Sequence, residues 1–370
     1  MSNPGKQRDF NKTSDLGKVL VTGSSGFVGA NFVKTLLDRG YGVRAFDITP
    51  CLHKHENLEV IVGNICDKAL VAEATKGIDT IFHIAAIIEL KGGRAVTQEY
   101  RDRSYSVNVG GTQNLLTSAQ ANGAKRFVYT ASNSVVIGGQ PIANGDESLP
   151  YTSRFNDLYT ETKVAAEKWV LSQNGVGNVL TCSIRPSGIW GPGDQTMFRQ
   201  MFAQMVNGLL KARVGGGTAR LDNSYVHNLI HGQILAAQHL VEGGTAPGEA
   251  YFINDDDPLN MFVFARPVIE GVGHHYPGIA VPAALVKWVM QTWQFLHFSF
   301  GLKEPPIPPL AVERIALDNY FSIAKAKRDL GYQPLYTTAQ AMEECLPYYR
   351  ELYAQMSQAA RNNPTALQSR

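Results

Sequence analysis

The chain has 370 residues, of which 44% are hydrophobic and 18% are charged. This composition is typical of a globular protein with a large buried core, and the length allows one large domain or two lobes. The formal net charge is only +2, so the sequence gives no sign of a nucleic-acid-binding surface or of a strongly anionic partner.

The cysteines, the histidines and the N-terminal stretch argue against a disulfide-stabilised, metal-binding or secreted protein. The four cysteines form no CxxC pair, so we expect no disulfide framework and a reducing, cytoplasmic location. The nine histidines do not join cysteines or carboxylates at metal-ligand spacing, so we expect no metal site. The polar stretch 1–16 lacks the apolar run of a signal peptide, and we expect a disordered tail there.

The first half of the chain alternates short apolar runs with amphipathic stretches near 68–76, 103–122 and 157–172. Strands and helices that alternate at this spacing predict an α/β fold, a Rossmann-type doubly wound parallel sheet with helices on both faces. We therefore expect a first domain at 17–190. Its predicted strands are 18–22, 41–46, 58–62, 80–85, 126–130 and 180–184.

The second half is less regular after Pro186. A helical run and a further strand within 225–254 indicate that segment 221–256 returns to the first domain. The rest of 191–355 predicts a smaller, mostly helical lobe that binds substrate, and 356–370 predicts a polar C-terminal tail.

A glycine-rich turn, TGSSGFVG, follows the first predicted strand and opens the first predicted helix. Gly23 allows the tight turn, Gly26 lets backbone amides approach a pyrophosphate, and Gly29 lets helix and strand pack closely. The first helical residues, Phe27 and Val28, offer free N–H groups and the positive end of the helix dipole to the phosphates. The turn therefore predicts a dinucleotide-binding site.

Residues at other strand ends select the type of dinucleotide. Asp47 ends the second strand, where a carboxylate accepts hydrogen bonds from ribose hydroxyls and repels a 2′-phosphate. This position favours NAD over NADP as the cofactor. Asn64 and Ile65 after the third strand are placed to meet the adenine, and the small Ala85 after the fourth strand lets the cofactor lie close to the chain.

Tyr159 and Lys163 are four positions apart in a predicted helix, so they share one face. A phenol has a reference pKa of about 10, which a nearby ammonium and the positive nicotinamide ring would lower. Tyr159 could then take the proton of a substrate hydroxyl while hydride leaves for the cofactor. Ser132 after the fifth strand could hold the substrate oxygen, with Ser134 as the alternative. Asn108, in the preceding helix, is a further candidate for the cofactor site, where it could anchor backbone or a water near Lys163; a solvent-facing side chain is the alternative.

Together these motifs resemble the extended short-chain dehydrogenase/reductase superfamily, whose members share TGxxGxxG, a Ser or Thr, and YxxxK. Within it the chain is most similar to the 3β-hydroxysteroid dehydrogenase/Δ5–Δ4 isomerase family, in particular to its actinobacterial members that oxidise cholesterol with NAD. The segments that carry the resemblance are FVYTASNS (127–134), FNDLYTETK (155–163), IRPSGIWGPGD (184–194), SYVHNLIH (224–231), YFINDDDP (251–258) and KAKRDLGYQPL (325–335).

The resemblance implies a catalytic trio of Ser132, Tyr159 and Lys163, with Pro186 and Gly188 lining the nicotinamide. It also implies a substrate and a reaction. The 3β-hydroxyl of a cholesterol-like 3β-hydroxy-5-ene sterol would be oxidised by NAD to the 3-ketone. Movement of the Δ5 double bond would then give a 3-keto-4-ene steroid.

The isomerisation needs an acid/base group that moves a proton from C4 to C6. Tyr225, His227 and Asp222 are the candidates, and Tyr225 and His227 are also expected to bind substrate. The aromatic-rich segment 285–302 has three interpretations: a helix packed on the core, a lid over an apolar substrate, or a surface in peripheral contact with a membrane.

Two other functions use the same pattern. A nucleotide-sugar epimerase or dehydratase grips a diphosphate with several basic side chains, but segment 284–302 contains one lysine, Lys287, and no arginine. A non-catalytic dinucleotide-binding regulator would not need the YxxxK pair, which this chain keeps. The resemblance to the superfamily also implies a homodimer through the helices near 103–122 and 157–172.

Overall fold

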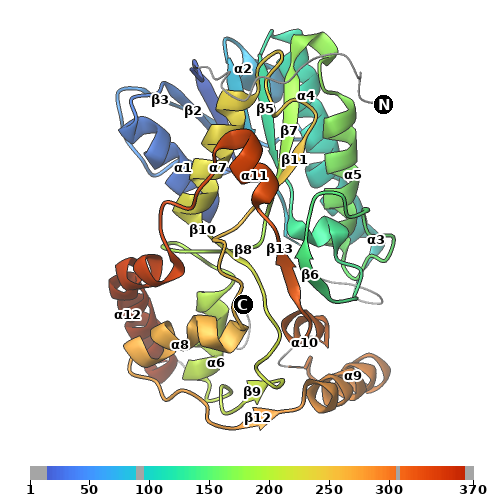
Figure 1. Cartoon of the computed structure of the whole chain (residues 1–370), viewed down its shortest axis with the longest axis vertical. Coiled ribbons are helices and arrows are strands. Elements are labelled where there is room, and N and C mark those ends of the chain that lie inside the picture. Colours follow the sequence, from blue (N-terminus) through green and yellow to red (C-terminus); the bar gives the residue numbers. More distant parts are fainter. Residues whose placement is uncertain (1–14, 89–95, 306–308, 363–370) are drawn as a thin grey trace.

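The computed structural model describes residues 15–88, 96–305 and 309–362. The protein has a larger α/β lobe around a parallel sheet and a smaller, mostly helical lobe, drawn below it in Figure 1. The disordered tail expected at 1–16 falls almost wholly outside the described residues, and so does the end of the polar tail expected at 356–370.

Seven parallel strands form the sheet of the larger lobe, in the order β11-β7-β5-β4-β1-β2-β3. This arrangement confirms the predicted doubly wound parallel sheet. The central strands are buried along their whole length, as expected where helices cover both faces. The strands are β1 (Val19–Thr22), β2 (Val43–Asp47), β3 (Leu58–Val62), β4 (Thr80–His83), β5 (Arg126–Thr130), β7 (Leu180–Pro186) and β11 (Ala250–Ile253).

Two layers of helices cover the sheet. One layer contains α1 and α7, and the other contains α2, α4 and α5. Because side chains alternate along a strand, Val19 and Val21 belong to the core under the first layer and Leu20 to the core under the second. The helices are α1 (Phe27–Asp38), α2 (Lys68–Thr75), α4 (Thr112–Ala121), α5 (Leu158–Ser172), α7 (Val226–His239) and, at the sheet edge, α11 (Ala324–Leu330).

The single helix expected at 103–122 is divided into three parts. They are α3 (Gln98–Tyr105), a π-helical segment (Ser106–Gly111) and α4. The π-helical segment ends against Ile65, where a Cβ on Gly111 would come within 2.5 Å of the Ile65 side chain. Such wide helical turns occur frequently at functional sites, and this one carries a predicted site residue.

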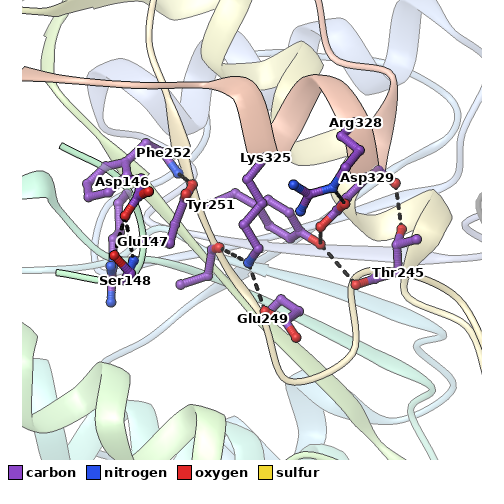
Figure 2. Close-up of polar contacts among 12 residues, drawn as sticks. Asp146, Glu147, Ser148, Thr245, Glu249, Tyr251, Phe252, Lys325, Arg328 and Asp329 are labelled. Carbon is purple, nitrogen blue, oxygen red and sulfur yellow. Dashed lines mark hydrogen bonds and ion pairs between the residues drawn. The ribbon is translucent and has the colours of Figure 1, made fainter. Parts of the chain in front are cut away.

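The edge strand β11 is covered by α11 from the C-terminal part of the chain. Lys325 Nζ donates hydrogen bonds to the Ala250 carbonyl (2.6 Å) and to Glu249 (2.8 Å), and it lies 4.2 Å from the Tyr251 ring centroid (Figure 2). Segment 221–256 thus joins the larger lobe through α7 and β11. The sequence predicts α11 in the smaller lobe, whereas the structure places it against β11 of the larger lobe. There its lysine donates a hydrogen bond to a backbone carbonyl of the edge strand.

The smaller lobe is built around an aromatic core between α6, α8 and α12. The rings of Trp190, Phe198, Phe264 and Tyr349 pack with centroids 4.5 to 6.4 Å apart. Residues 356–362 of the expected polar tail instead continue α12, and Met356 is buried on its inner face. The helices are α6 (Phe198–Val206), α8 (Met261–Gly271), α9 (Ala283–Phe300), α10 (Pro309–Ala316) and α12 (Thr338–Asn362).

Three short parallel strand pairs connect the lobes and brace the smaller one. They are β8 (Gly188–Trp190) with β10 (Asn223–Tyr225), β6 (Ile142–Gly145) with β13 (Asn319–Phe321), and β9 (Arg213–Val214) with β12 (Ala280–Val281).

Helix α9 packs on α10 at the end of the smaller lobe that lies farthest from the sheet (Figure 1). None of its residues is buried, and Trp288 and Phe300 are 63% and 72% exposed. The interpretation of this segment as a helix packed on the core is therefore wrong. Among the helices of residues 15–88, 96–305 and 309–362, none is long and apolar enough to cross a bilayer.

Candidate active site

A cavity of about 600 Å³ runs along the carboxyl ends of the sheet strands, where ligands bind in open parallel sheets. Most of the sequence-predicted site residues line it, and six do not. Those that line it are Gly23, Gly26, Phe27, Val28, Gly29, Asp47, Asn64, Ile65, Ala85, Ser132, Tyr159, Lys163 and Pro186; those that do not are Asn108, Ser134, Gly188, Asp222, Tyr225 and His227.

The glycine turn forms one end of this cavity. Gly23 has a φ of +69°, and a Cβ there would lie 2.8 Å from the Ala85 nitrogen, while a Cβ on Gly29 would lie 2.0 Å from the Gly23 oxygen. Helix α1 begins after Gly26 without a side-chain cap and without an acidic residue in its first turn. Its first amides are therefore available to an anion, so this end of the cavity fits a dinucleotide pyrophosphate.

Asp47 closes the same end of the cavity. Its Oδ2 accepts a hydrogen bond from the Ser25 amide (3.0 Å) and its Oδ1 accepts one from the Thr49 amide (3.1 Å). These bonds fix the carboxylate at the end of β2 and leave lone pairs for ribose hydroxyls. Arg44, earlier in β2, is buried and donates to the carbonyls of Ala74 and Lys76. It is therefore no partner for a 2′-phosphate.

Lys163 lies at the opposite end of the cavity, under the sheet edge. Its Nζ donates to the Thr130 carbonyl (2.7 Å) and lies 4.8 Å from the Tyr129 ring centroid and 5.8 Å from that of Tyr159. Burial lowers the pKa of Lys163 to about 7. The ammonium is thus held by a backbone carbonyl and two aromatic faces. Because burial lowers its pKa, the side chain is only partly protonated at neutral pH.

The Tyr159 phenol lies close to the Ser132 hydroxyl, and both residues line the cavity. The pKa of Tyr159 is raised to about 12, mainly by burial and in addition by the Asp157 carboxylate, while Ser132 and the Arg314 charge act to lower it. The Lys163 ammonium donates to the Thr130 carbonyl, and the expectation that it lowers this pKa together with a bound nicotinamide ring stays a prediction. The sequence pattern did not indicate that Asp157 and Arg314 bear on the phenol.

Asn108 acts on the site from behind the cavity wall. Its Oδ1 accepts from the Ile87 amide (2.8 Å), and its Nδ2 donates to the Ile87 carbonyl (3.0 Å) and to Thr162 Oγ1 (3.0 Å). Thr162 lies on α5 between Tyr159 and Lys163. The π-helical segment therefore ties the loop after β4 to α5, and Asn108 anchors backbone, which is one of the roles that the sequence left open.

His83, at the end of β4, is a site residue that the sequence analysis missed. Its ring nitrogens hydrogen-bond Thr22 Oγ1 and Thr112 Oγ1, both at 2.8 Å. Burial and then the Lys163 charge lower the pKa of His83 to about 3. The ring is therefore neutral and joins β1, β4 and α4 beneath the glycine turn. The sequence signal that could have identified it is a histidine at the end of an otherwise apolar, buried strand.

The structure does not bring the three isomerisation candidates to the cavity. Tyr225 is fully buried and packs on Trp190 at 4.9 Å between ring centroids, and His227 packs on Tyr225 at 5.2 Å. Asp222 accepts hydrogen bonds from the Asn254 side chain and from the Phe321 amide. All three residues lie in the junction between the lobes, where Tyr225 and His227 pack on other rings and Asp222 accepts hydrogen bonds.

Ser134 and Gly188 also lie away from the cavity. The Ser134 amide donates to Ser132 Oγ (3.1 Å), and the Ser134 hydroxyl is buried on the other side of this turn. Gly188 faces Met197, whose Cε a Cβ would approach to 2.8 Å. In contrast, Arg103 lines the cavity, and no sequence pattern marked it.

The sheet, the glycine turn and the Ser132–Tyr159–Lys163 group define a protein of the short-chain dehydrogenase/reductase type. Solved structures with this fold include an epimerase from Methanothermobacter thermautotrophicus (TM-score 0.73, 20% identity, 93% of this chain and 95% of that chain). Another is a short-chain dehydrogenase/reductase superfamily protein from Agrobacterium tumefaciens with bound NAD (TM-score 0.68, 22% identity, 92% and 99%).

Residues 20–283 match the model of the 3-beta hydroxysteroid dehydrogenase/isomerase family, and the chain belongs to this family. It is 64% identical over 359 residues to a 3 beta-hydroxysteroid dehydrogenase/Delta 5→4-isomerase of Mycobacterium tuberculosis, with 97% of each chain covered. It is 65% identical over 344 residues to a 3-beta-hydroxysteroid dehydrogenase of Mycolicibacterium neoaurum, with 93% of this chain and 94% of the relative covered.

Proposed function

We propose that this protein oxidises the 3β-hydroxyl of a cholesterol-like 3β-hydroxy-5-ene sterol with NAD, and then moves the Δ5 double bond to Δ4. The observation that carries the proposal is the Ser132–Tyr159 hydroxyl pair, which lines one cavity together with the uncapped glycine turn and Asp47. Family membership and the names of relatives at 64 and 65% identity support the same substrate class.

In the oxidation, the chain positions the alcohol and removes its proton. Bound NAD supplies the hydride acceptor and a positive ring beside the phenol. Ser132 holds the substrate oxygen, and Tyr159 takes its proton as a general base. Lys163, fixed by the Thr130 carbonyl, keeps positive charge behind the phenol and stabilises its anion.

For the cofactor, the fixed Asp47 carboxylate and the buried Arg44 support NAD rather than NADP. The glycine turn, Asn64, Ile65 and Ala85 provide the adenosine and pyrophosphate end of the cavity. The nicotinamide would then lie between Pro186 and Tyr159.

For the isomerisation, the 3-ketone makes the C4 hydrogens acidic, because the resulting carbanion is an enolate conjugated with the Δ5 bond. Among the described residues, the ionisable side chains that line the cavity are those of Asp47, Arg103, Tyr159 and Lys163. We propose that the isomerisation occurs in this same cavity. Supplying the 3-keto-5-ene steroid directly to Tyr159→Phe, and following enone absorbance, tests whether that phenol takes part.

The oxidation is tested by NADH absorbance with cholesterol, pregnenolone and UDP-sugars as alternative substrates. We expect sterol turnover with NAD and not with NADP, conjugated enone in the product, and no reaction with the sugar nucleotides. Tyr159→Phe should lower kcat by about 10²- to 10⁴-fold, the usual contribution of a general base. Unchanged turnover in this variant would refute the proposal.

The cavity disfavours a nucleotide-sugar epimerase or dehydratase. Such an enzyme needs several cations for a substrate diphosphate, whereas Arg103 and Lys163 are the basic side chains that the described residues contribute to the lining. Lys163 is buried and bonded to Thr130. Turnover of a UDP-sugar would reverse this conclusion.

We also propose that α9 makes peripheral contact with a lipid surface. Trp288, Phe295 and Phe300 are 59 to 72% exposed, and none of the described α9 residues lines the cavity, which disfavours the lid interpretation. Exposed aromatic residues on one helix are typical of interfacial binding. Replacement of these three residues by serine should abolish sedimentation with phosphatidylcholine vesicles while pregnenolone turnover persists.

The homodimer through α3–α4 and α5 remains a proposal that sedimentation velocity would test.

A further inference from the structure

Asp157 is a buried carboxylate two residues before Tyr159. It caps α5, since its Oδ1 accepts from the Thr160 amide (2.7 Å) and its Oδ2 accepts from Thr160 Oγ1 (3.2 Å). Its side chain has no exposed surface. A buried carboxylate at this point requires a positive partner, because desolvation of an unpaired charge costs several kcal/mol.

The partner of this carboxylate comes from the other lobe. Arg314 on α10 donates from Nη2 to Asp157 Oδ2 and forms the ion pair. In the part of the chain that the structure describes, it is the cation that pairs with Asp157. The preceding residue, Glu313, forms an ion pair with Lys287 of α9 at 2.7 Å. Two successive α10 residues thus connect the exposed helix α9 to the start of the catalytic helix.

Charged and titratable groups reach Tyr159 from three elements. Helix α5 contributes Asp157 and Lys163, strand β5 contributes Tyr129, and α10 contributes Arg314. Asp157 raises the pKa of Tyr159 and Arg314 lowers it. If Arg314 were removed, the carboxylate would remain beside the phenol without its compensating charge.

We propose that Arg314 is a positioning residue for the oxidation. By neutralising Asp157 from the smaller lobe, it makes Tyr159 fully reactive only when α10 is seated on the start of α5. The inference rests on the proposed function, because it takes Tyr159 as the base. The chemistry itself remains with Tyr159, and Arg314 acts through Asp157.

The test is the pH dependence of kcat, from single-turnover NADH formation with pregnenolone. Arg314→Met should move the profile to higher pH and slow the reaction about tenfold at neutral pH, since one pH unit in the base corresponds to a tenfold change in phenolate. Asp157→Asn still caps the helix, removes the charge, and should move the profile to lower pH. The double variant should recover most of the rate that Arg314→Met loses.

Arg266→Met is the matched control, because Arg266 is an exposed arginine of the same lobe that pairs with Glu270; its profile should equal that of the parent. A parental profile for Arg314→Met, or a double variant as slow as Arg314→Met, would overturn the inference. If Arg314→Met does not fold, an unmoved Asp157→Asn profile overturns it equally. An active Tyr159→Phe would instead refute the proposed function itself.

Discussion

Replacement of Asn108 by alanine distinguishes a bracing role behind the cavity from direct contact with the cofactor. The Asn108 side chain is 1% exposed and makes three hydrogen bonds of 2.8 to 3.0 Å, two with the Ile87 backbone and one with Thr162. The alanine variant removes all three of these hydrogen bonds. Thr162 keeps its bond to the Tyr159 carbonyl, and the Ile87 backbone is only partly buried, so water can replace some of the loss.

The magnitude follows from these contacts. A buried polar group left without a partner costs about 1–3 kcal/mol. With one group protected by a second bond and two partly hydrated, we expect the free energy of unfolding to fall by about 3 kcal/mol. Because Thr162 lies between Tyr159 and Lys163, we also expect kcat to fall by about tenfold or more, since small misplacements of catalytic groups are expensive.

Urea unfolding, kcat and the Kd for NADH together check this prediction. The Kd should change by no more than about twofold, because the side chain does not line the cavity. Asn108→Asp serves as the shape-matched control, since it retains the acceptor for the Ile87 amide and loses the two donated bonds. A large rise in Kd with parental stability would show that Asn108 binds the cofactor directly, and would refute the bracing role.

Three further changes test other parts of the molecule. Asp47→Ala should raise KM for NAD about tenfold and permit turnover with NADP, because a charged hydrogen-bond acceptor for ribose is lost; steady-state kinetics with both cofactors measures this. Lys325→Met should lower the free energy of unfolding by about 1–3 kcal/mol, since the bonds that Lys325 donates to the Ala250 carbonyl and to Glu249 are lost; parental stability in urea would contradict it. Burial raises the pKa of Asp222 from 3.8 to about 7, so the folded state binds an extra proton and stability falls as pH rises through this window. Asp222→Asn should flatten that decline between pH 4 and pH 7, as urea unfolding at the two limits would show.

The sheet and most of the cavity could be predicted because their signals are local. A strand, a glycine turn and a helix occupy adjacent positions in the sequence, and the carboxyl ends of parallel strands meet at one edge whatever lies between them. Gly23, Asp47, Ser132 and Tyr159 all lie at such ends or in the helix that follows. Their meeting in one cavity therefore required only the correct strand pattern.

The pattern was less informative where a side chain can serve either of two purposes. Tyr225 ends a short strand in the junction between the lobes and His227 follows it, at a place where a substrate residue could also lie. The structure uses them for ring packing against Trp190 and Tyr336. An aromatic ring is suited to both tasks, so only the docking of the two lobes decides between them. The π-helical segment at Asn108 was missed for a related reason, because one wide turn leaves the 3.6-residue hydrophobic pattern almost unchanged.

The electrostatic surroundings of the base were the least predictable feature. Asp157 and Arg314 are 157 positions apart, and neither belongs to the YxxxK motif. The motif points to Lys163, together with the nicotinamide ring, as what prepares the phenol, whereas the folded chain adds a carboxylate from the cap of α5 and a guanidinium from the smaller lobe. The reactivity of Tyr159 therefore depends on how the lobes are docked.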